Sequence, residues 1–226
     1  MKYTAFWKSS CLALAATWAI AACNEAPKGD KAEITEKQQA AAITGQTFVV
    51  DTAASMVEFI GNGVGKNHPG TFRLTSGKVA ISNDHITGGE FIININSLSL
   101  KEQGEMFQTK LRPHLLSGDF FDAQNFGTAK FEITKVEPYK PDGQDTSLVQ
   151  GANFNVSGNF TLKGVTKNIT FPARIELDEN SMEAKANFDI DRRQWQMNYG
   201  NDKTLGDKFI SETVNIRLNL EADKQP

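Results

Sequence analysis

Apolar and polar residues alternate through most of the second half of the chain. Between residues 148 and 162 the even positions are mostly apolar, and the odd positions between them are mostly Asn, Ser, Thr or Gly. Lys163-Gly164 interrupts this pattern, and from Val165 to Leu177 the apolar residues occupy the odd positions. An alternation of period two predicts strands with one apolar and one polar face, and the interruption predicts a hairpin turn.

The same alternation returns at residues 182–190 and 214–220, with apolar residues at the even positions. The first half of the chain is less regular, and its candidate strands are Thr47–Val50, Ser55–Ile60, Gly70–Ser76, Lys78–Ile81 and Gly89–Asn96. Turns are expected at Gly61-Asn62-Gly63 and at Asn83-Asp84, because these residue types favour turns. The count of strands is therefore about eight or nine.

One segment between the two halves has helical spacing. Met106, Phe107, Lys110 and Leu111 fall on one face of a helix predicted over residues 101–116. Pro113 is expected to end or kink this helix, because proline lacks the backbone N–H. The sequence thus predicts an all-β protein with one short inserted helix.

Strands with single apolar faces must hide those faces, and an antiparallel barrel of about eight strands does so while removing exposed sheet edges. Such a barrel is either packed solid or holds one small ligand. The predicted inner face mixes large Phe residues with small ones, namely Ala152, Gly158, Ala173, Ala184 and Ala186. The small residues either leave room for a ligand or face large residues across a packed core, and the pattern alone does not decide between the two.

Composition narrows the classes of function. The 226 residues carry a formal charge of −3 with a pI near 5.7, which argues against nucleic acid as a partner. The only two cysteines, Cys11 and Cys23, exclude a disulfide framework and a Cys-rich zinc site. The three histidines lack the close spacing of a metal site, so no metal or other cofactor is expected.

The N-terminal segment has the layout of a secretory signal, with early lysines followed by an uncharged apolar stretch that ends in small residues. Its last residues, Ile20-Ala21-Ala22-Cys23, resemble a bacterial lipobox, which implies a signal peptide over residues 1–22 and lipidation of Cys23. The alternative is an ordinary signal with a chance cysteine. Residues 23–45 are predicted to be a flexible tether, within which Lys31 to Ala42 form a short helix.

Four segments of the chain stand out, namely Gly70 to Phe72, Ser117 to Asp122, Ala129 to Phe131 and Val156 to Thr170. In this order and spacing they resemble the YceI-like family of lipid-binding proteins. The resemblance covers residues 46–222 and leaves a C-terminal tail at 223–226. It implies a lipocalin-like barrel with an apolar tunnel that holds a polyisoprenoid or a related amphiphile, such as an isoprenoid quinone, in a secreted or periplasmic protein.

The alternation and the resemblance together predict which residues form the binding site. The expected tunnel lining consists of Phe154, Val156, Phe160, Phe171, Ile175, Phe188, Ile216 and Leu218. The residues expected to contact a polar head group are Lys66, His68, Arg192, Trp195 and Tyr199.

The leading hypothesis is a non-enzymatic protein of the cell envelope that binds, stores or carries a long-chain lipid. Acylation at Cys23 would anchor it, and Asn24, in place of the aspartate that often signals inner-membrane retention, favours the outer membrane facing the periplasm. One alternative is a solid-core structural or interaction module without a ligand, and another is an enzyme that uses His114 and Asp119. The oligomeric state stays open, with a homodimer as one option.

Overall fold

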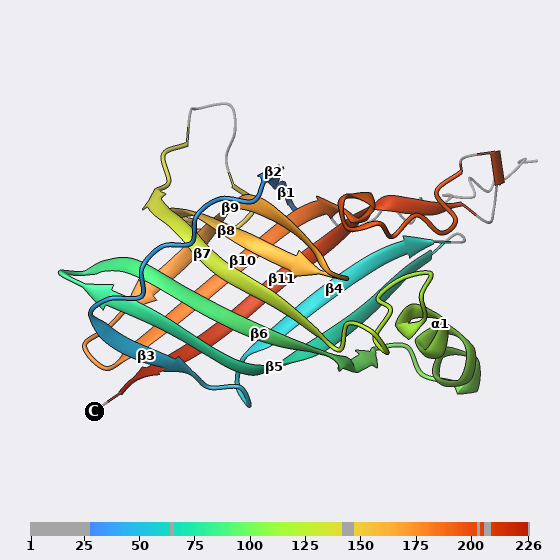
Figure 1. Ribbon diagram of the computed structural model, residues 1–226, viewed down its shortest axis with the longest axis horizontal. Helices are drawn as coiled ribbons and strands as arrows, with labels where there is room; N and C mark the ends of the chain where they lie inside the picture. The colour runs from blue at the N-terminus through green and yellow to red at the C-terminus, as the bar shows by residue number, and fades with distance from the viewer. Residues whose placement is uncertain (1–27, 64–65, 142–146, 203, 206–208, 226) are drawn as a thin grey trace, which may run out of the picture.

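The structure is a computed structural model that describes residues 28–63, 66–141, 147–202, 204–205 and 209–225. It consists mostly of strands, with one short helical segment between β6 and β7 (Figure 1). The strands are β1 (Asp30–Lys31), β2 (Glu33–Glu36), β3 (Gln46–Val50), β4 (Met56–Gly63), β5 (Lys66–Ser82), β6 (His85–Leu100), β7 (Thr128–Pro138), β8 (Phe154–Leu162), β9 (Val165–Leu177), β10 (Ser181–Asp191) and β11 (Ile210–Lys224). The helical elements are η1 (Phe107–Leu111), α1 (Arg112–Leu116) and η2 (Arg192–Trp195).

The strands β4 to β11 close into an antiparallel barrel. Each strand pairs with the next along the chain, and β11 pairs back onto β4. The short strand β3 lies in line with β4, and both strands pair with β11 on one side and β5 on the other. Along β11, Val50 of β3 pairs with Ala222 and Met56 of β4 pairs with Asn219. The predicted fold class, an antiparallel barrel of eight strands with one inserted helix, is confirmed in the described part of the chain.

The hairpins follow the turn chemistry of the sequence. Lys163 and Gly164 connect β8 to β9 with φ angles of 50° and 74°, and Asn83 and Asp84 connect β5 to β6 with φ angles of 51° and 60°. Two successive residues with positive φ form the turn that matches the twist of a hairpin. Both turns lie where the sequence predicts them.

The first half of the barrel differs from the prediction in two places. Gly61-Asn62-Gly63 is not a turn but the end of β4, because the ladder with β5 continues as far as the pair Gly63 and Lys66. The two strands predicted over residues 70–76 and 78–81 are parts of the single strand β5. Register shifts between β5 and β6 interrupt the alternation of side chains, so one bent strand has the sequence pattern of two.

The inserted helix is shorter than predicted and does not end at proline. The Arg112 N–H donates to the Phe107 carbonyl in a wider π turn, and α1 follows directly. Pro113 lies in the first turn of α1, where no intrahelical N–H partner is required. The helix therefore does not end at Pro113, and the other predicted outcome, a kink at this residue, stays a prediction.

Residues 29–44, which we call the N-terminal strap, lie against the outside of the barrel. In place of the predicted helix, β1 pairs in parallel with β10, and β2 pairs antiparallel with β9 (Figure 1). The strands β9 and β10 pair directly only over residues 173–177 and 182–186, so their remaining edges accept the strap. Ala32 is buried there and donates its N–H to the Asp189 carbonyl at 3.1 Å. The expectation of a tether at these residues was wrong, because two open strand edges offer hydrogen bonds that a free chain lacks.

Polar residues on the outer face of the barrel hold the strap. Asn159 accepts from the Gln38 N–H at 3.0 Å and donates to its carbonyl at 2.7 Å. Asn215 donates to Asp189 at 2.8 Å beneath Gly29. Asn159 and Asn215 are buried, although the sequence places Asn215 on the solvent face of its strand, because the strap covers that face.

The two ends of the chain are described unequally. The predicted signal peptide and Cys23 lie outside the described residues. At the other end, β11 continues to Lys224, so part of the predicted tail pairs with β3.

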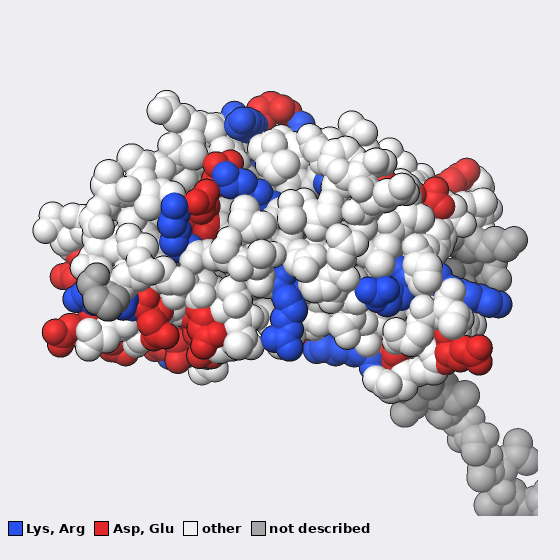
Figure 2. Space-filling view, turned by 60° about the horizontal axis from the view of Figure 1, so that its bottom comes forward, with Lys and Arg blue, Asp and Glu red and all other residues white. Residues whose placement is uncertain are grey.

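Within the described ranges, no helix has the length and hydropathy required to cross a membrane. Acidic and basic side chains are interspersed over the face in Figure 2.

Candidate functional site: an apolar cavity inside the barrel

The barrel encloses a cavity of about 470 Å³, which lies within the size range of small-molecule sites. Every barrel strand from β4 to β11 contributes to its wall, and residues from the η1–α1 segment join them at one end. Most of the lining side chains are Phe, Ile, Leu, Val or Ala. The interior is therefore suited to a molecule with extensive apolar surface.

The choice between a packed core and a cavity depends on where the small residues lie. Ala173 and Ala186 are direct neighbours across β9 and β10, and both line the cavity. Beside them, the rings of Phe171 and Phe188 stack at 4.0 Å on the wall. Gly158 differs, because the ring of Phe131 already occupies its space and a Cβ there would lie 2.1 Å from Phe131 Cζ. Adjacent alanines thus leave the volume open, whereas the glycine fits against a Phe ring.

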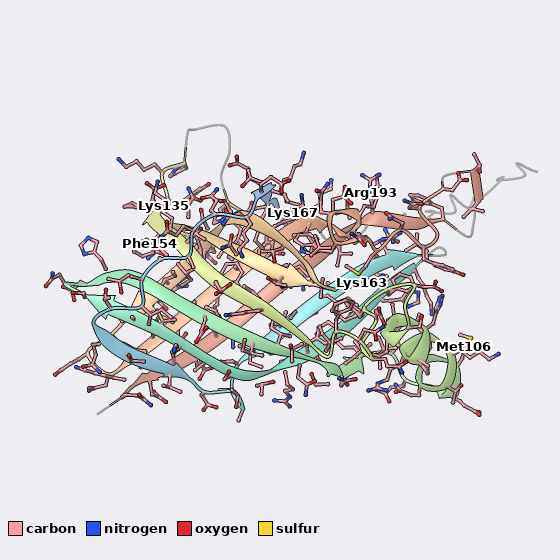
Figure 3. The ribbon with its side chains drawn as sticks, viewed as in Figure 1. Met106, Lys135, Phe154, Lys163, Lys167 and Arg193 are labelled. Carbon is pink, nitrogen blue, oxygen red and sulfur yellow. The ribbon has the colours of Figure 1, made fainter. Side chains whose placement is uncertain are left out.

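The structure places seven of the eight predicted tunnel residues on the cavity wall. These seven are Val156, Phe160, Phe171, Ile175, Phe188, Ile216 and Leu218. Phe154 instead lines a separate small cavity of about 40 Å³ with Ile81 and Met182. Phe154 is the first residue of β8 and lies toward the end of the barrel opposite Met106 (Figure 3). At this end its side chain does not line the main cavity.

The sequence interpretation missed the lining residues of the first half. Phe59 and Phe72 line the wall, and Phe121 contacts both rings, with centroids 6.1 and 5.1 Å away. The alternation of Val57 with Phe59 could have identified this part of the wall. Phe121 follows α1 in an irregular segment and shows no such signal.

A polar cluster lies on the wall at the end near η1. His68 lines the cavity, and its Nδ1 lies 2.7 Å from Glu102 Oε2. The ammonium of Lys66 binds the same carboxylate at 3.2 Å and lies 4.3 Å from the centre of the Phe107 ring. Lys66 itself is not part of the wall. The structure therefore places His68, but not Lys66, where a ligand could touch it.

A second cluster at this end contains His114 and Tyr199, both of which line the cavity. Nε2 of His114 lies 2.9 Å from Asp119 Oδ2, and its ring meets that of Tyr199 edge to face at 4.7 Å. Ser117 Oγ donates to the backbone carbonyl of His114 at 2.7 Å. A nucleophilic serine needs its hydroxyl within reach of the imidazole, and Ser117 Oγ is instead bonded to the backbone.

Arg192 lines the cavity, whereas Trp195 does not. The indole of Trp195 is fully buried, packs against Phe160 at 5.4 Å and donates Nε1–H to the Phe160 carbonyl at 3.1 Å. The prediction that Trp195 contacts a head group is therefore not supported by its position. The η2 turn after β10 directs this ring into the protein core, which the alternation along β10 does not anticipate.

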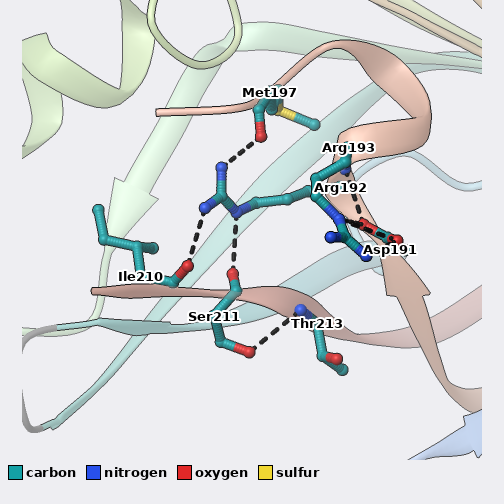
Figure 4. A network of polar contacts seen from close by, with 7 residues as sticks. All are labelled: Asp191, Arg192, Arg193, Met197, Ile210, Ser211 and Thr213. Atoms are coloured by element: carbon teal, nitrogen blue, oxygen red, sulfur yellow. Dashed lines mark hydrogen bonds and ion pairs between the residues drawn. The ribbon is translucent and has the colours of Figure 1, made fainter. Parts of the chain in front are cut away.

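Asp191 and Arg193 form an ion pair beside Arg192 (Figure 4). Burial alone would raise the pKa of Asp191, but hydrogen bonds from the side chain and backbone of Arg193 outweigh it and lower that pKa. The carboxylate of Asp191 also caps η2 by accepting from the Arg193 N–H. Among the residues with described positions, no group of three or more His, Cys, Asp or Glu side chains is arranged to hold a metal ion.

The closed antiparallel barrel with its internal apolar cavity is a lipocalin-like fold. Residues 48–222 match the model of the YceI-like domain, and the chain belongs to this family. The chain is 32% identical over 129 residues to a UPF0312 protein of Vibrio vulnificus, which covers 56% of this chain and 61% of the relative. It is 27% identical over 158 residues to a UPF0312 protein of Azotobacter vinelandii, which covers 69% of this chain and 74% of the relative. The match thus spans less than two thirds of the length of the Vibrio protein.

Two solved structures share the fold at low sequence identity. BcnA of Burkholderia cenocepacia has a TM-score of 0.59 and 19% identity, and the match covers 76% of this chain and 98% of BcnA. A polyisoprenoid binding domain from Saccharophagus degradans, implicated in plant cell wall breakdown, has a TM-score of 0.58 and 14% identity. That match covers 80% of this chain and 99% of the domain. The N-terminal strap lies outside the residues that match the family model.

Proposed function

We propose that this protein binds a polyisoprenoid or a similar long-chain amphiphile inside the barrel and makes or breaks no bond in it. The observation that carries the proposal is the cavity of about 470 Å³ inside the barrel, with its apolar wall. Membership of the YceI-like family and the fold shared with a polyisoprenoid binding domain support it. An isoprenoid quinone is one candidate ligand.

Hydrophobic burial supplies enough free energy for such binding. Burying one CH₂ group contributes about 0.8 kcal/mol, so an isoprene unit of five carbons contributes roughly 4 kcal/mol before costs. A few units offset the loss of translational and conformational freedom on binding. Binding of this kind discriminates weakly between chain lengths, because one methylene more or less changes the affinity little.

The cellular setting is part of the same proposal. Cleavage before Cys23 and its acylation would anchor the protein in the cell envelope, at the outer membrane facing the periplasm. Two lipid signals are required for stable anchoring, which a diacylated cysteine provides. Mass spectrometry of the N-terminal peptide from membranes tests this, and loss of the lipid mass in a Cys23→Ser variant is the expected result. An unmodified Cys23 in the membrane fraction would refute the anchor.

Organic extraction of the purified protein, followed by mass spectrometry, tests the ligand. A long-chain lipid at a fixed ratio to protein is the expected result. The delipidated protein should melt at a higher temperature when an isoprenoid is added, because a ligand that binds only the folded state stabilises it. A protein that is isolated empty, and whose melting temperature does not respond to isoprenoids, would favour a structural or interaction module.

A further inference from the structure

The apolar series of β10 ends in a charged residue on the cavity wall. Met182, Ala184, Ala186, Phe188 and Ile190 point inward at every second position and line the cavity. Arg192 is the next position of this series, is only 3% exposed and lines the same cavity. A guanidinium group therefore stands where the alternation would place another apolar side chain.

Backbone carbonyls hold this guanidinium in place (Figure 4). Nε donates to the Ser211 carbonyl at 2.8 Å, Nη2 donates to the carbonyls of Tyr199 and Ile210 at 2.9 Å each, and Nη1 donates to the Met197 carbonyl. These bonds use four of the five N–H donors of arginine. They satisfy the hydrogen-bonding capacity of these donors, but carbonyl dipoles carry no net charge, so the four carbonyls do not neutralise the positive charge of Arg192.

The carboxylate nearest to Arg192 along the chain, that of Asp191, pairs with Arg193. The side chain of Asp191 binds Arg193, with Nε at 2.9 Å and Nη2 at 2.7 Å, and Arg193 lies at the surface (Figure 3). Burial lowers the pKa of Arg192, and the charges of Asp191 and Glu212 act in the opposite direction. Arginine nevertheless stays protonated in proteins.

Among the described residues, the other basic groups on the wall have carboxylate partners, whereas no described Asp or Glu side chain forms an ion pair with Arg192. His68 faces Glu102 and His114 faces Asp119, as described above. The ammonium of Lys185 lies outside near Glu183, and the residue is half exposed. No Asp or Glu lines the cavity within the ranges that the structure describes. The wall therefore has one buried cation and no anion.

We propose that the cavity prefers amphiphiles with an anionic head group, a carboxylate or a phosphate, over neutral ones such as a prenol or a quinone. The head group lies beside Arg192, near the rings of Phe120 and Tyr199, and the chain extends along Phe188 toward Ala186. An anion placed there offsets the desolvation of the guanidinium, whereas a neutral head group leaves the charge uncompensated. This inference rests on the proposed function and specifies its ligand class.

Four ligands with isoprenoid chains test the preference: farnesyl phosphate, farnesoic acid, farnesol and a short-chain isoprenoid quinone. The dissociation constants of the delipidated wild-type protein are measured at a pH where both acids are ionised. We expect both anionic ligands to bind at least tenfold more tightly than farnesol and the quinone. Tighter binding of only the phosphate or only the carboxylate identifies the head group. Equal affinities would overturn the inference and leave the proposed function intact, and no binding of any ligand would overturn both.

Two neighbouring arginines provide matched variants. Arg192→Gln removes the cation on the wall, and Arg193→Gln removes one at the surface. We expect Arg192→Gln to abolish the preference and Arg193→Gln to retain it. A preference that is retained in folded Arg192→Gln would overturn the assignment to Arg192. Because Arg192 also binds four carbonyls, the variant is first checked by circular dichroism, and if it is unfolded the wild-type ligand series decides alone.

Discussion

A substitution of Ala173 by phenylalanine tests whether the barrel is hollow. Ala173 faces Ala186 on the cavity wall, so the new ring extends into the void. The added ring has six carbons, about as many as one isoprene unit of five. Displacing that unit removes roughly 4 kcal/mol of ligand burial, which corresponds to binding weaker by on the order of a thousandfold. The stability of the ligand-free protein should change little, because the ring fills space that is already open.

The same substitution at Ala222 is the matched control. Ala222 is buried on β11 but does not line the cavity. A phenylalanine there overpacks a filled core and should lower the free energy of unfolding by about 1–3 kcal/mol. Urea unfolding and titration of a fluorescent isoprenoid into both folded variants provide the two measurements. If Ala173→Phe is destabilised as much as Ala222→Phe, and still binds the isoprenoid with wild-type affinity, the reasoning from the cavity is refuted.

Three further predictions concern the strap, the packing and the pH dependence. In Gly29→Val, a Cβ would lie 2.7 Å from the Phe188 backbone, so the start of the strap should detach from the barrel. The hydrogen exchange of the Ala32 amide should then be at least tenfold faster than in the wild type. Unchanged protection of this amide would contradict the prediction. Gly158→Ala should lower the free energy of unfolding by about 1–3 kcal/mol, because the Phe131 ring must move, and an unchanged urea midpoint would count against it. The pKa of Asp191 in the folded protein is below its usual value of 3.8. The ion pair of Asp191 therefore stabilises the folded state fully above pH 3.8. This stabilisation is lost as the pH falls through the folded-state pKa. The difference in unfolding free energy between wild type and Asp191→Asn should therefore shrink below about pH 4, and a constant difference from pH 6 to pH 2 would exclude this titration.

The strap shows how local sequence and tertiary contacts can disagree. Residues 31–42 have the composition of a solvated helix, but β1 and β2 pair with the open edges of β10 and β9. Those edges exist only once the barrel has formed. The buried amide of Asn159 has the same origin, since the strap, and not its own strand, removes it from water. Neither feature has a signal within a window of neighbouring residues.

The sequence by itself determined the barrel class, the β8–β9 hairpin and most of the predicted wall, because the side-chain period of two and the turn residues are local properties of the chain. Only the tertiary structure decided that Ala173 and Ala186 adjoin across two strands and leave a void, whereas Gly158 receives a Phe ring. It also decided that Trp195 turns into the core and that Arg192 lies on the wall with no carboxylate partner among the described residues. Cavity volume and charge compensation depend on which residues from distant strands meet, and the register and closure of the sheet determine those meetings.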